Sequence, residues 1–198
     1  MAITQQQVTG VILAGGQGSR LGGADKSLLE WQGRPLIEHL MTAFQTQVGS
    51  LVINANRNQA SYQRYGLAVI NDQHPNYQGP LAGLAAAMQV VETPYLLTIP
   101  GDSFYIAPDF AARMLKALNQ SGAELVVAHD GINLQPVYAL VPVDLLPSLE
   151  AFLARGERKL RAWYAEQQMI TVDCSDIASM FQNINTPAQY QALQAGRL

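Results

Sequence analysis

The stretch Val8-Thr-Gly-Val-Ile-Leu-Ala-Gly-Gly-Gln-Gly-Ser-Arg-Leu-Gly-Gly-Ala-Asp-Lys26 joins an apolar run to five glycines within nine residues. The run Val11-Ile12-Leu13 is rich in β-branched residues and predicts a strand that is buried on both faces. Glycines allow positive φ and close approach of the backbone to a ligand, so their peptide N–H groups can act as donors. Arg20 and Lys26 add positive charge to the loop. A strand that ends in such a loop predicts a phosphate site.

Two common phosphate-binding patterns do not fit this loop. The dinucleotide pattern G-x-G-x-x-G needs glycine where Leu21 stands, and the Walker A pattern needs glycine where Asp25 stands. A surface turn with two solvated cations therefore remains an alternative. The buried strand before the loop favours a ligand site, because ligands of parallel sheets bind beyond the carboxyl ends of the strands.

The loop does resemble that of a known family. Its residues Leu13-Ala14-Gly15-Gly16-x-Gly18-x-Arg20-Leu21-Gly22-Gly23-x-Asp25-Lys26 are similar to the signature of nucleotidyltransferases, which move a nucleoside monophosphate from an NTP onto a phosphate. The doubled glycine followed by Asp-Lys resembles most the molybdenum cofactor guanylyltransferases. The resemblance implies transfer of GMP from GTP to the terminal phosphate of the molybdopterin cofactor, with release of pyrophosphate and with Mg²⁺ as cofactor. It also implies contact with proteins that deliver or receive the molybdenum cofactor.

Three other functions stay open at this point. Two are sister enzymes, a molybdopterin cytidylyltransferase and a sugar-phosphate nucleotidyltransferase. The third is a nucleotide- or cofactor-binding module without catalytic activity. Three charge-stabilising residues (Arg20, Lys26 and Asp102) favour an enzyme, because a pure binding module does not need all of them.

Composition restricts the class of protein. With 198 residues, 48% of them hydrophobic and 14% charged, the chain is expected to form one domain over 1–198 with a sizeable core. A net charge of −3 argues against nucleic-acid binding, which needs a basic face. Cys174 is the only cysteine, which excludes an internal disulfide and is compatible with a reducing compartment. The longest nearly apolar stretch, 81–91, is far shorter than the ~20 residues of a membrane span. We therefore expect a soluble cytoplasmic protein without a membrane partner.

Strand, loop and helix patterns alternate through the first half of the chain. This alternation predicts an α/β fold, a Rossmann-like three-layer sandwich with a mostly parallel sheet and helices on both faces. The expected strands are 11–13, 51–53, 67–70 and 95–99, with a short extended piece and a turn over 28–35. The expected helices are 36–47, 59–64, 80–91 and 108–119.

The second half is less regular and predicts an antiparallel excursion. Segments 124–129 and 134–141 are expected to pair around the Asp130-Gly131 turn, which is a typical hairpin signal. Further expected elements are helices at 142–154 and 159–166, a strand at 169–172, and a C-terminal helix with Thr186 as N-cap and Pro187 at its first position. We expect the nucleotide to bind the half at about 8–103 and the acceptor to bind the half at about 104–198.

Polar residues follow the predicted strands at Asn54, Asp72 and Asp102, and these ends should meet Gly15 at one edge of the sheet. Asp102 follows an apolar strand in a Pro-Gly-Asp turn and is a metal candidate, although a turn or N-cap aspartate is the alternative. The resemblance favours the metal, because this turn is similar to the family's magnesium-binding turn. The segment 79–83, Gly-Pro-Leu-Ala-Gly, resembles the family's turn against the base; its alternative is a closely packed helix start.

The resemblance implies a set of site residues. The implied catalytic residues are Arg20, Lys26 and Asp102, and Asp102 also holds the metal. The implied nucleotide-binding residues are Leu13, Ala14, Gly15, Gly16, Gly18, Lys26, Asn54, Asp72, Gly79, Pro80, Leu81, Gly83 and Asp102. Segment 135–140, the basic turn 156–159 and the Asn-x-Asn motif at 183–185 resemble the acceptor side, which implies Gln135, Tyr138, Arg158, Lys159, Asn183 and Asn185. For the basic turn, a solvated helix face remains the alternative.

Overall fold

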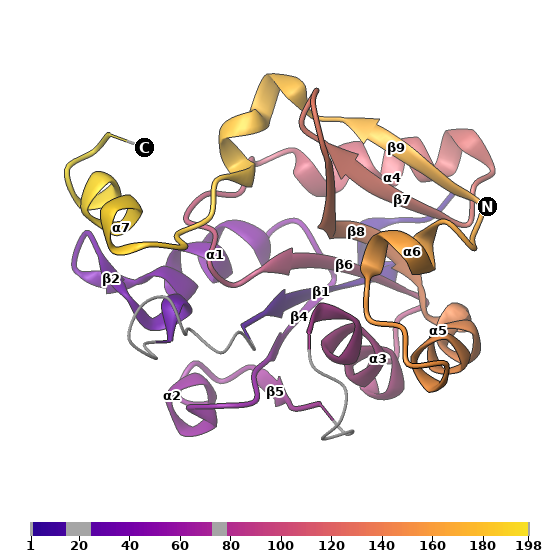
Figure 1. Cartoon of the computed structure of the whole chain (residues 1–198), viewed down its shortest axis with the longest axis horizontal. Coiled ribbons are helices and arrows are strands. Elements are labelled where there is room, and N and C mark those ends of the chain that lie inside the picture. Colours follow the sequence, from indigo (N-terminus) through magenta and orange to yellow (C-terminus); the bar gives the residue numbers. More distant parts are fainter. Residues whose placement is uncertain (1, 15–24, 73–78, 198) are drawn as a thin grey trace.

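The computed structural model of the chain describes residues 2–14, 25–72 and 79–197. Within them, one seven-stranded sheet has the order β5-β4-β1-β6-β8-β7-β9 (Figure 1). The strands are β1 (Val8–Leu13), β4 (Ser50–Asn54), β5 (Ala68–Ile70), β6 (Tyr95–Pro100), β7 (Leu125–His129), β8 (Leu134–Pro142) and β9 (Met169–Asp173). Strand β8 runs antiparallel to both β6 and β7, whereas the other neighbouring pairs are parallel. The expected mostly parallel sheet with an antiparallel excursion is confirmed.

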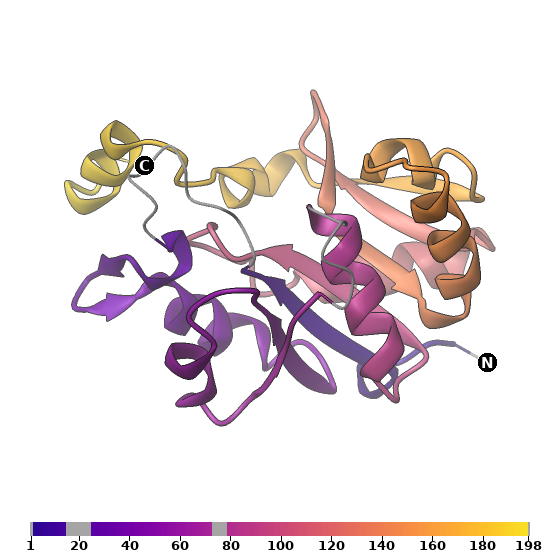
Figure 2. The same cartoon turned by 60° about the horizontal axis from the view of Figure 1, so that its bottom comes forward.

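Helices cover both faces of this sheet. They are α1 (Leu36–Phe44), α2 (Gln59–Gln63), α3 (Pro80–Val90), α4 (Phe110–Ser121), α5 (Leu146–Ala154), α6 (Leu160–Tyr164) and α7 (Pro187–Gln194). One core cluster joins the sheet to α1, α2 and α4, and a second joins it to α3, α5 and α6. Figures 1 and 2 show the sheet between these two helical layers. The fold is therefore the expected three-layer sandwich.

The central strands and α3 have the most hydrophobic sequences because they are covered on more than one side. Val11 and Ile12 of β1 are fully buried between neighbouring strands β4 and β6. Every residue from Leu81 to Met88 of α3 is buried, since α3 packs against both the sheet and α5. Helices α1 and α4 bury one face each, with Leu40 and Met114 fully buried.

Several element bounds differ from the expectation. The predicted helix start at 142 is wrong because β8 continues through Pro142, which pairs with Tyr95. A short 3-10 turn, η4 (Val143–Leu145), then precedes α5. The short extended piece and turn expected over 28–35 are present as a strand, a turn at 32–33 and a second strand. The 3-10 turn η3 (Lys26–Leu28) leads into a small antiparallel pair of β2 (Glu30–Trp31) and β3 (Arg34–Pro35). The described residues also include the 3-10 segments η1 (Gln5–Gln7) and η5 (Ser175–Phe181).

The C-terminal helix lies beside the β2–β3 pair (Figure 1). Leu193 of α7 is buried with Leu36 and Ile184 in a small separate cluster. The Tyr190 hydroxyl donates to the carbonyl of Glu30 over 2.6 Å. The expected N-cap is confirmed, since the Thr186 side chain accepts from a backbone N–H of the first turn. Among the described residues, no helix has the length and apolar character needed to cross a bilayer.

Candidate active site

The carboxyl ends of the parallel strands meet at one edge through backbone hydrogen bonds. The N–H of Ala14 donates to Asn54 over 2.8 Å, and the N–H of Gly101 donates to Leu13 over 2.9 Å. The chain therefore enters the glycine loop between the ends of β4 and β6. The loop residues Gly15, Gly16, Gly18 and Arg20 lie outside the described residues, so their assignments stay predictions.

Lys26 and Asp102 meet at this edge although 76 positions separate them. The Lys26 Nζ lies 3.0 Å from Asp102 Oδ2, and the two side chains are 19% and 22% exposed. Nζ also donates to Asn185 Oδ1 over 2.6 Å. Lys26 thus contacts Asp102, which was expected on the nucleotide side like Lys26 itself, and Asn185, which was expected on the acceptor side.

Gly101 explains how the turn that carries Asp102 comes so close to the start of the loop. A Cβ atom at this position would lie 2.5 Å from Ser27 Oγ and 2.9 Å from Ala14 Cα. Real Cβ atoms do not approach backbone atoms so closely, so only glycine lets β6 end against both segments. The Pro-Gly-Asp turn is therefore a packing requirement as well as a candidate metal turn.

Asn54 and Asp72 form a polar cluster at the ends of β4 and β5. The amide of Asn54 donates to Asp72 Oδ1 over 3.0 Å and to the carbonyl of Ile70 over 3.3 Å. Asn56, which the sequence reasoning did not select, donates to Asp72 Oδ2 over 2.8 Å and accepts from the Asp72 N–H. Its position two residues after Asn54, beyond the end of a buried strand, was the available signal.

Helix α3 packs directly on this cluster. A Cβ atom at Gly83 would overlap Asn54 Oδ1 and would lie 2.9 Å from Leu13 Cδ2. The helix begins with exposed Gly79, whose φ of 110° is in the region that favours glycine, followed by exposed Pro80. Leu81 is only 1% exposed. The segment 79–83 is thus exposed at Gly79 and Pro80 and closely packed at Gly83, against Asn54 and Leu13.

Tyr138, which was expected beside the acceptor, lies in the core. It is 1% exposed, and burial raises the pKa of its hydroxyl well above the usual range. The hydroxyl lies 2.5 Å from Ser103 Oγ and donates to the carbonyl of Met180. Ser103 is fully buried and also contacts Asn183 Oδ1 over 3.1 Å. In this arrangement Tyr138 supports the segment that carries Asn183.

The C-terminal strip that contains Asn183 and Asn185 lies against the Pro-Gly-Asp turn. Ser103 and Asn183 form an antiparallel bridge, and the N–H of Ile184 donates to the carbonyl of Asp102. An open pocket of about 440 Å³ adjoins the strip. It is lined by Phe181, Gln182, Asn183, Asn185 and Gln189. The strip therefore offers amide groups and space immediately beside the Lys26–Asp102 pair.

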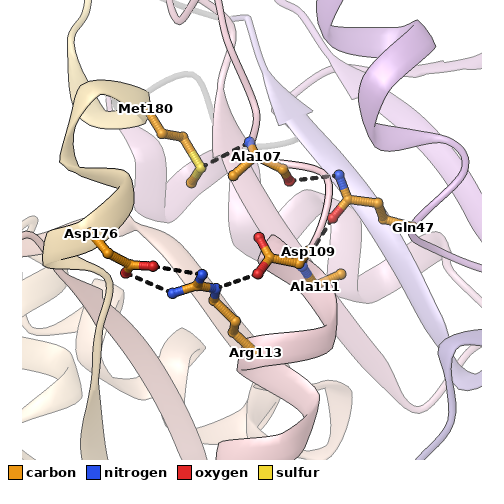
Figure 3. Close-up of polar contacts among 7 residues, drawn as sticks. All are labelled: Gln47, Ala107, Asp109, Ala111, Arg113, Asp176 and Met180. Atoms are coloured by element: carbon orange, nitrogen blue, oxygen red, sulfur yellow. Dashed lines mark hydrogen bonds and ion pairs between the residues drawn. The ribbon is translucent and has the colours of Figure 1, made fainter.

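Farther back, Arg113 attaches η5 to α4 (Figure 3). Its guanidinium contacts both oxygens of Asp176 over 2.7 Å each and Asp109 over 2.7 Å. Arg113 holds the pKa of Asp176 below its usual range. Met180 Sδ in turn accepts from the N–H of Ala107 over 3.4 Å. These contacts fix the segment that leads into the Asn183–Asn185 strip.

The other acceptor-side candidates, Gln135, Arg158 and Lys159, lie in two different segments, the β7–β8 hairpin and the turn after α5. Gln135 is the second residue of β8, the second strand of the hairpin, and donates to Asp130 Oδ2 over 2.6 Å. Arg158 donates to the carbonyls of Leu153 and Glu157 and so closes the end of α5. Lys159 is exposed in the same turn.

No group of three or more His, Cys, Asp or Glu side chains suited to a metal ion occurs within 2–14, 25–72 and 79–197. A single carboxylate nevertheless fits Mg²⁺, which is commonly held by one or two carboxylates together with substrate phosphates and water. Asp102, partly exposed at the end of β6, is such a carboxylate. The donor set is therefore compatible with a metal that arrives with a nucleotide.

Comparison with known proteins gives consistent matches along the chain. Residues 10–171 match the MobA-like NTP transferase domain. A molybdenum cofactor guanylyltransferase of Shewanella halifaxensis (strain HAW-EB4) is 48% identical over 187 residues, which is 94% of either chain. One from Shewanella pealeana (strain ATCC 700345 / ANG-SQ1) is 46% identical, again over 94% of both chains.

Solved structures share the fold. The structure of molybdopterin-guanine dinucleotide biosynthesis protein A from Archaeoglobus fulgidus superposes with a TM-score of 0.79 at 20% identity and covers 94% of this chain and 97% of its own. A nucleotidyl transferase from Methanothermobacter thermautotroptrophicus superposes with a TM-score of 0.73 at 18% identity, covering 96% and 97%.

Proposed function

Because the chain belongs to the MobA-like NTP transferase family, we propose that it transfers GMP from GTP to the terminal phosphate of molybdopterin. The products are pyrophosphate and the guanine dinucleotide form of the cofactor. The observation that carries the proposal is the meeting of Lys26, Asp102 and Asn185 at the carboxyl edge of the sheet. This is where ligands of parallel sheets bind.

The reaction needs alignment and charge neutralisation more than proton transfer. The acceptor phosphate is already ionised near neutral pH, so it can attack the α-phosphorus without a strong general base. Lys26 would offset the charge that develops on the α-phosphate and the leaving pyrophosphate, together with Arg20 and the amides of Gly15, Gly16 and Gly18. Lys26 acts through position, because Asp102 and Asn185 hold its ammonium group before the substrates arrive.

Nucleotidyltransferases typically use a divalent metal ion, and we assign Mg²⁺ to Asp102. When bound there, Mg²⁺ supplies positive charge to the phosphate oxygens. Lys26 already contacts Asp102 Oδ2, so the protein holds the carboxylate in one orientation before the metal–nucleotide arrives. Asn185 holds the lysine from the other side.

Base selection is proposed to take place at the Asn54–Asp72 cluster and the start of α3. These polar groups are fixed by hydrogen bonds to one another and by close packing against Gly83. A pocket matched to guanine leaves donors or acceptors unpaired when another base enters, at a cost of about 1–3 kcal/mol for each buried group. GTP should therefore react better than ATP or CTP.

The acceptor is proposed to bind at the Asn183–Asn185 strip, with Gln135 and the basic turn of Arg158 and Lys159 beyond it. The strip lies within hydrogen-bond distance of the nucleotide-side lysine. Both substrates could therefore meet at Lys26. Tyr138 serves this site indirectly, through its hydroxyl contacts to Ser103 and Met180.

The proposal is tested with the purified chain, molybdopterin, Mg²⁺ and α-labelled GTP, CTP or ATP in parallel. Label should appear in a dinucleotide product from GTP, with release of pyrophosphate. Asp102→Asn should reduce turnover by about 100-fold or more, by analogy with loss of one charge-stabilising group, while Asp144→Asn on the exposed η4 turn serves as the control. Preference for CTP, or full activity of Asp102→Asn, would overturn the assignment.

A second experiment separates the two substrates. Lys159→Ala should weaken molybdopterin binding and leave the Kd for GTP unchanged, because the basic turn belongs to the acceptor side. The single variant is preferable to one at Arg158, whose guanidinium closes the end of α5. Calorimetric titration with each ligand measures both constants. Loss of GTP affinity with intact molybdopterin affinity would contradict the proposed division.

A further inference from the structure

Asp25 precedes the proposed catalytic lysine but has no role in the reaction described above. Its side chain does not cap the η3 turn that it begins. A carboxylate beside a triphosphate site is unfavourable, because like charges repel. The Asp25 carboxylate therefore needs a hydrogen-bond donor that stabilises it, and one is present.

The donor is Asn58, the N-cap residue of α2. Asn58 Nδ2 donates to Asp25 Oδ2 over 3.0 Å across 33 positions. Asn58 has a φ of 52°, a left-handed conformation that asparagine tolerates better than most residues. Its carbonyl accepts from the N–H groups of Ser61 and Tyr62, so the residue is fixed by the first turn of the helix.

A second residue of α2, Tyr62, lies near the same carboxylate. Tyr62 is fully buried, and its hydroxyl has no hydrogen bond of good geometry among the residues that the structure describes. Burial raises the pKa of this hydroxyl far above its usual range, and the nearby Asp25 charge raises it further. Tyr62 thus lies near Asp25 and lengthens the contact of this segment with α2, without a hydrogen bond between the two side chains.

The same segment is held from the opposite side. Ser27 is 3% exposed and lies against Gly101, where a Cβ atom would come within 2.5 Å of its hydroxyl. Lys26 thus lies between two anchored neighbours, Asp25 attached to α2 and Ser27 packed on the Pro-Gly-Asp turn. Its own side chain extends to Asp102 and Asn185.

We propose that Asp25 is a positioning residue, whose hydrogen bond from Asn58 at the start of α2 fixes Lys26 at the reacting phosphate without touching the substrate. This inference rests on the catalytic role proposed for Lys26. It assigns a function to α2, which packs against β5. It also explains why an acidic residue is tolerated at this point of a phosphate-binding loop.

Steady-state kinetics of GMP transfer tests the proposal. Asp25→Ala should lower kcat by roughly 10- to 100-fold while the KM for GTP changes by less than about 3-fold, since misplacement of a catalytic group by 1 Å can cost about that much. Asp25→Asn keeps an oxygen acceptor and should recover activity to within about 5-fold of wild type. Asn58→Gly removes the amide but keeps the left-handed backbone, so it should fold and reproduce part of the loss.

The decisive comparison is the double variant of Asp25→Ala with Lys26→Ala. If Asp25 acts through the lysine, the kcat of the double variant should equal that of Lys26→Ala alone within about 3-fold. Multiplied losses, an Asn variant as slow as the Ala variant, or wild-type kcat in Asp25→Ala would each overturn the inference and leave the role of Lys26 intact. Wild-type kcat in Lys26→Ala would instead refute the proposed catalytic lysine, and the inference with it. Asp144→Ala, an exposed aspartate on η4, is the matched control.

Discussion

Replacing Lys26 with alanine should separate catalysis from stability. The ammonium lies 3.0 Å from Asp102 Oδ2 in a site where both side chains are about one-fifth exposed. Two unit charges 4 Å apart near a protein surface interact with about 4 kcal/mol. Only the charge that builds up between ground state and transition state counts toward kcat, so we expect a loss of about 2–4 kcal/mol.

This energy corresponds to a decrease in kcat/KM of roughly 30- to 1,000-fold. The effect on folding should be much smaller, because a partly exposed ion pair contributes about 1 kcal/mol or less. For a chain of this size, that is a decrease in Tm of about 2–4 °C. Pyrophosphate release with GTP and molybdopterin measures the first quantity, and thermal unfolding measures the second.

The exposed residue Lys116 on α4 provides the control, since Lys116→Ala removes the same charge far from the edge. Its kcat/KM and Tm should stay close to those of wild type. The reasoning is refuted if Lys26→Ala keeps wild-type kcat/KM. It is also refuted if the loss of activity is matched by a large decrease in Tm, because the lysine would then be a structural residue.

Two further predictions concern packing and pH. Gly83→Val should destabilise the fold by about 1–3 kcal/mol, because its side chain must displace Asn54, and it should also weaken GTP binding; thermal unfolding and titration measure both, and a variant with wild-type Tm would contradict the packing. Arg113 holds the pKa of Asp176 below its usual range, so the contribution of this pair is present above about pH 4 and lost as the pH falls through the lowered pKa. Asp176→Asn should therefore lower the Tm at pH 7, and the two Tm curves should approach each other as the pH falls below about 4. A constant difference from pH 7 to pH 2.5 would show that the ionised carboxylate is not the stabilising group.

The type and order of the main elements could be predicted from the sequence. Periodicity and composition are local, and the buried strands and the amphipathic helices α1 and α4 carry both signals. The start of α5 was misplaced because Pro142 reads as a helix start, whereas pairing with Tyr95 keeps it in β8. That pairing joins residues 47 positions apart, which no local pattern reports.

Parts of the candidate site were predictable for the same reason. Asp102, Asn54 and Asp72 each follow a strand, and parallel strands bring such ends to one edge. Asn56, Asn58 and Ser103 were missed, because each acquires its contact from a segment distant in sequence.

The sequence by itself determined the α/β class, the sheet edge at which the polar residues Asn54, Asp72 and Asp102 lie, and the family resemblance of the first loop. Only the tertiary structure decided which polar groups touch. Lys26 meets Asn185 across 159 positions, and the Tyr138 hydroxyl turns inward to Met180. The physical reason is that a hydrogen bond requires its two atoms to lie within about 3 Å of each other. Over such separations in sequence, only the packing of all three layers sets that distance.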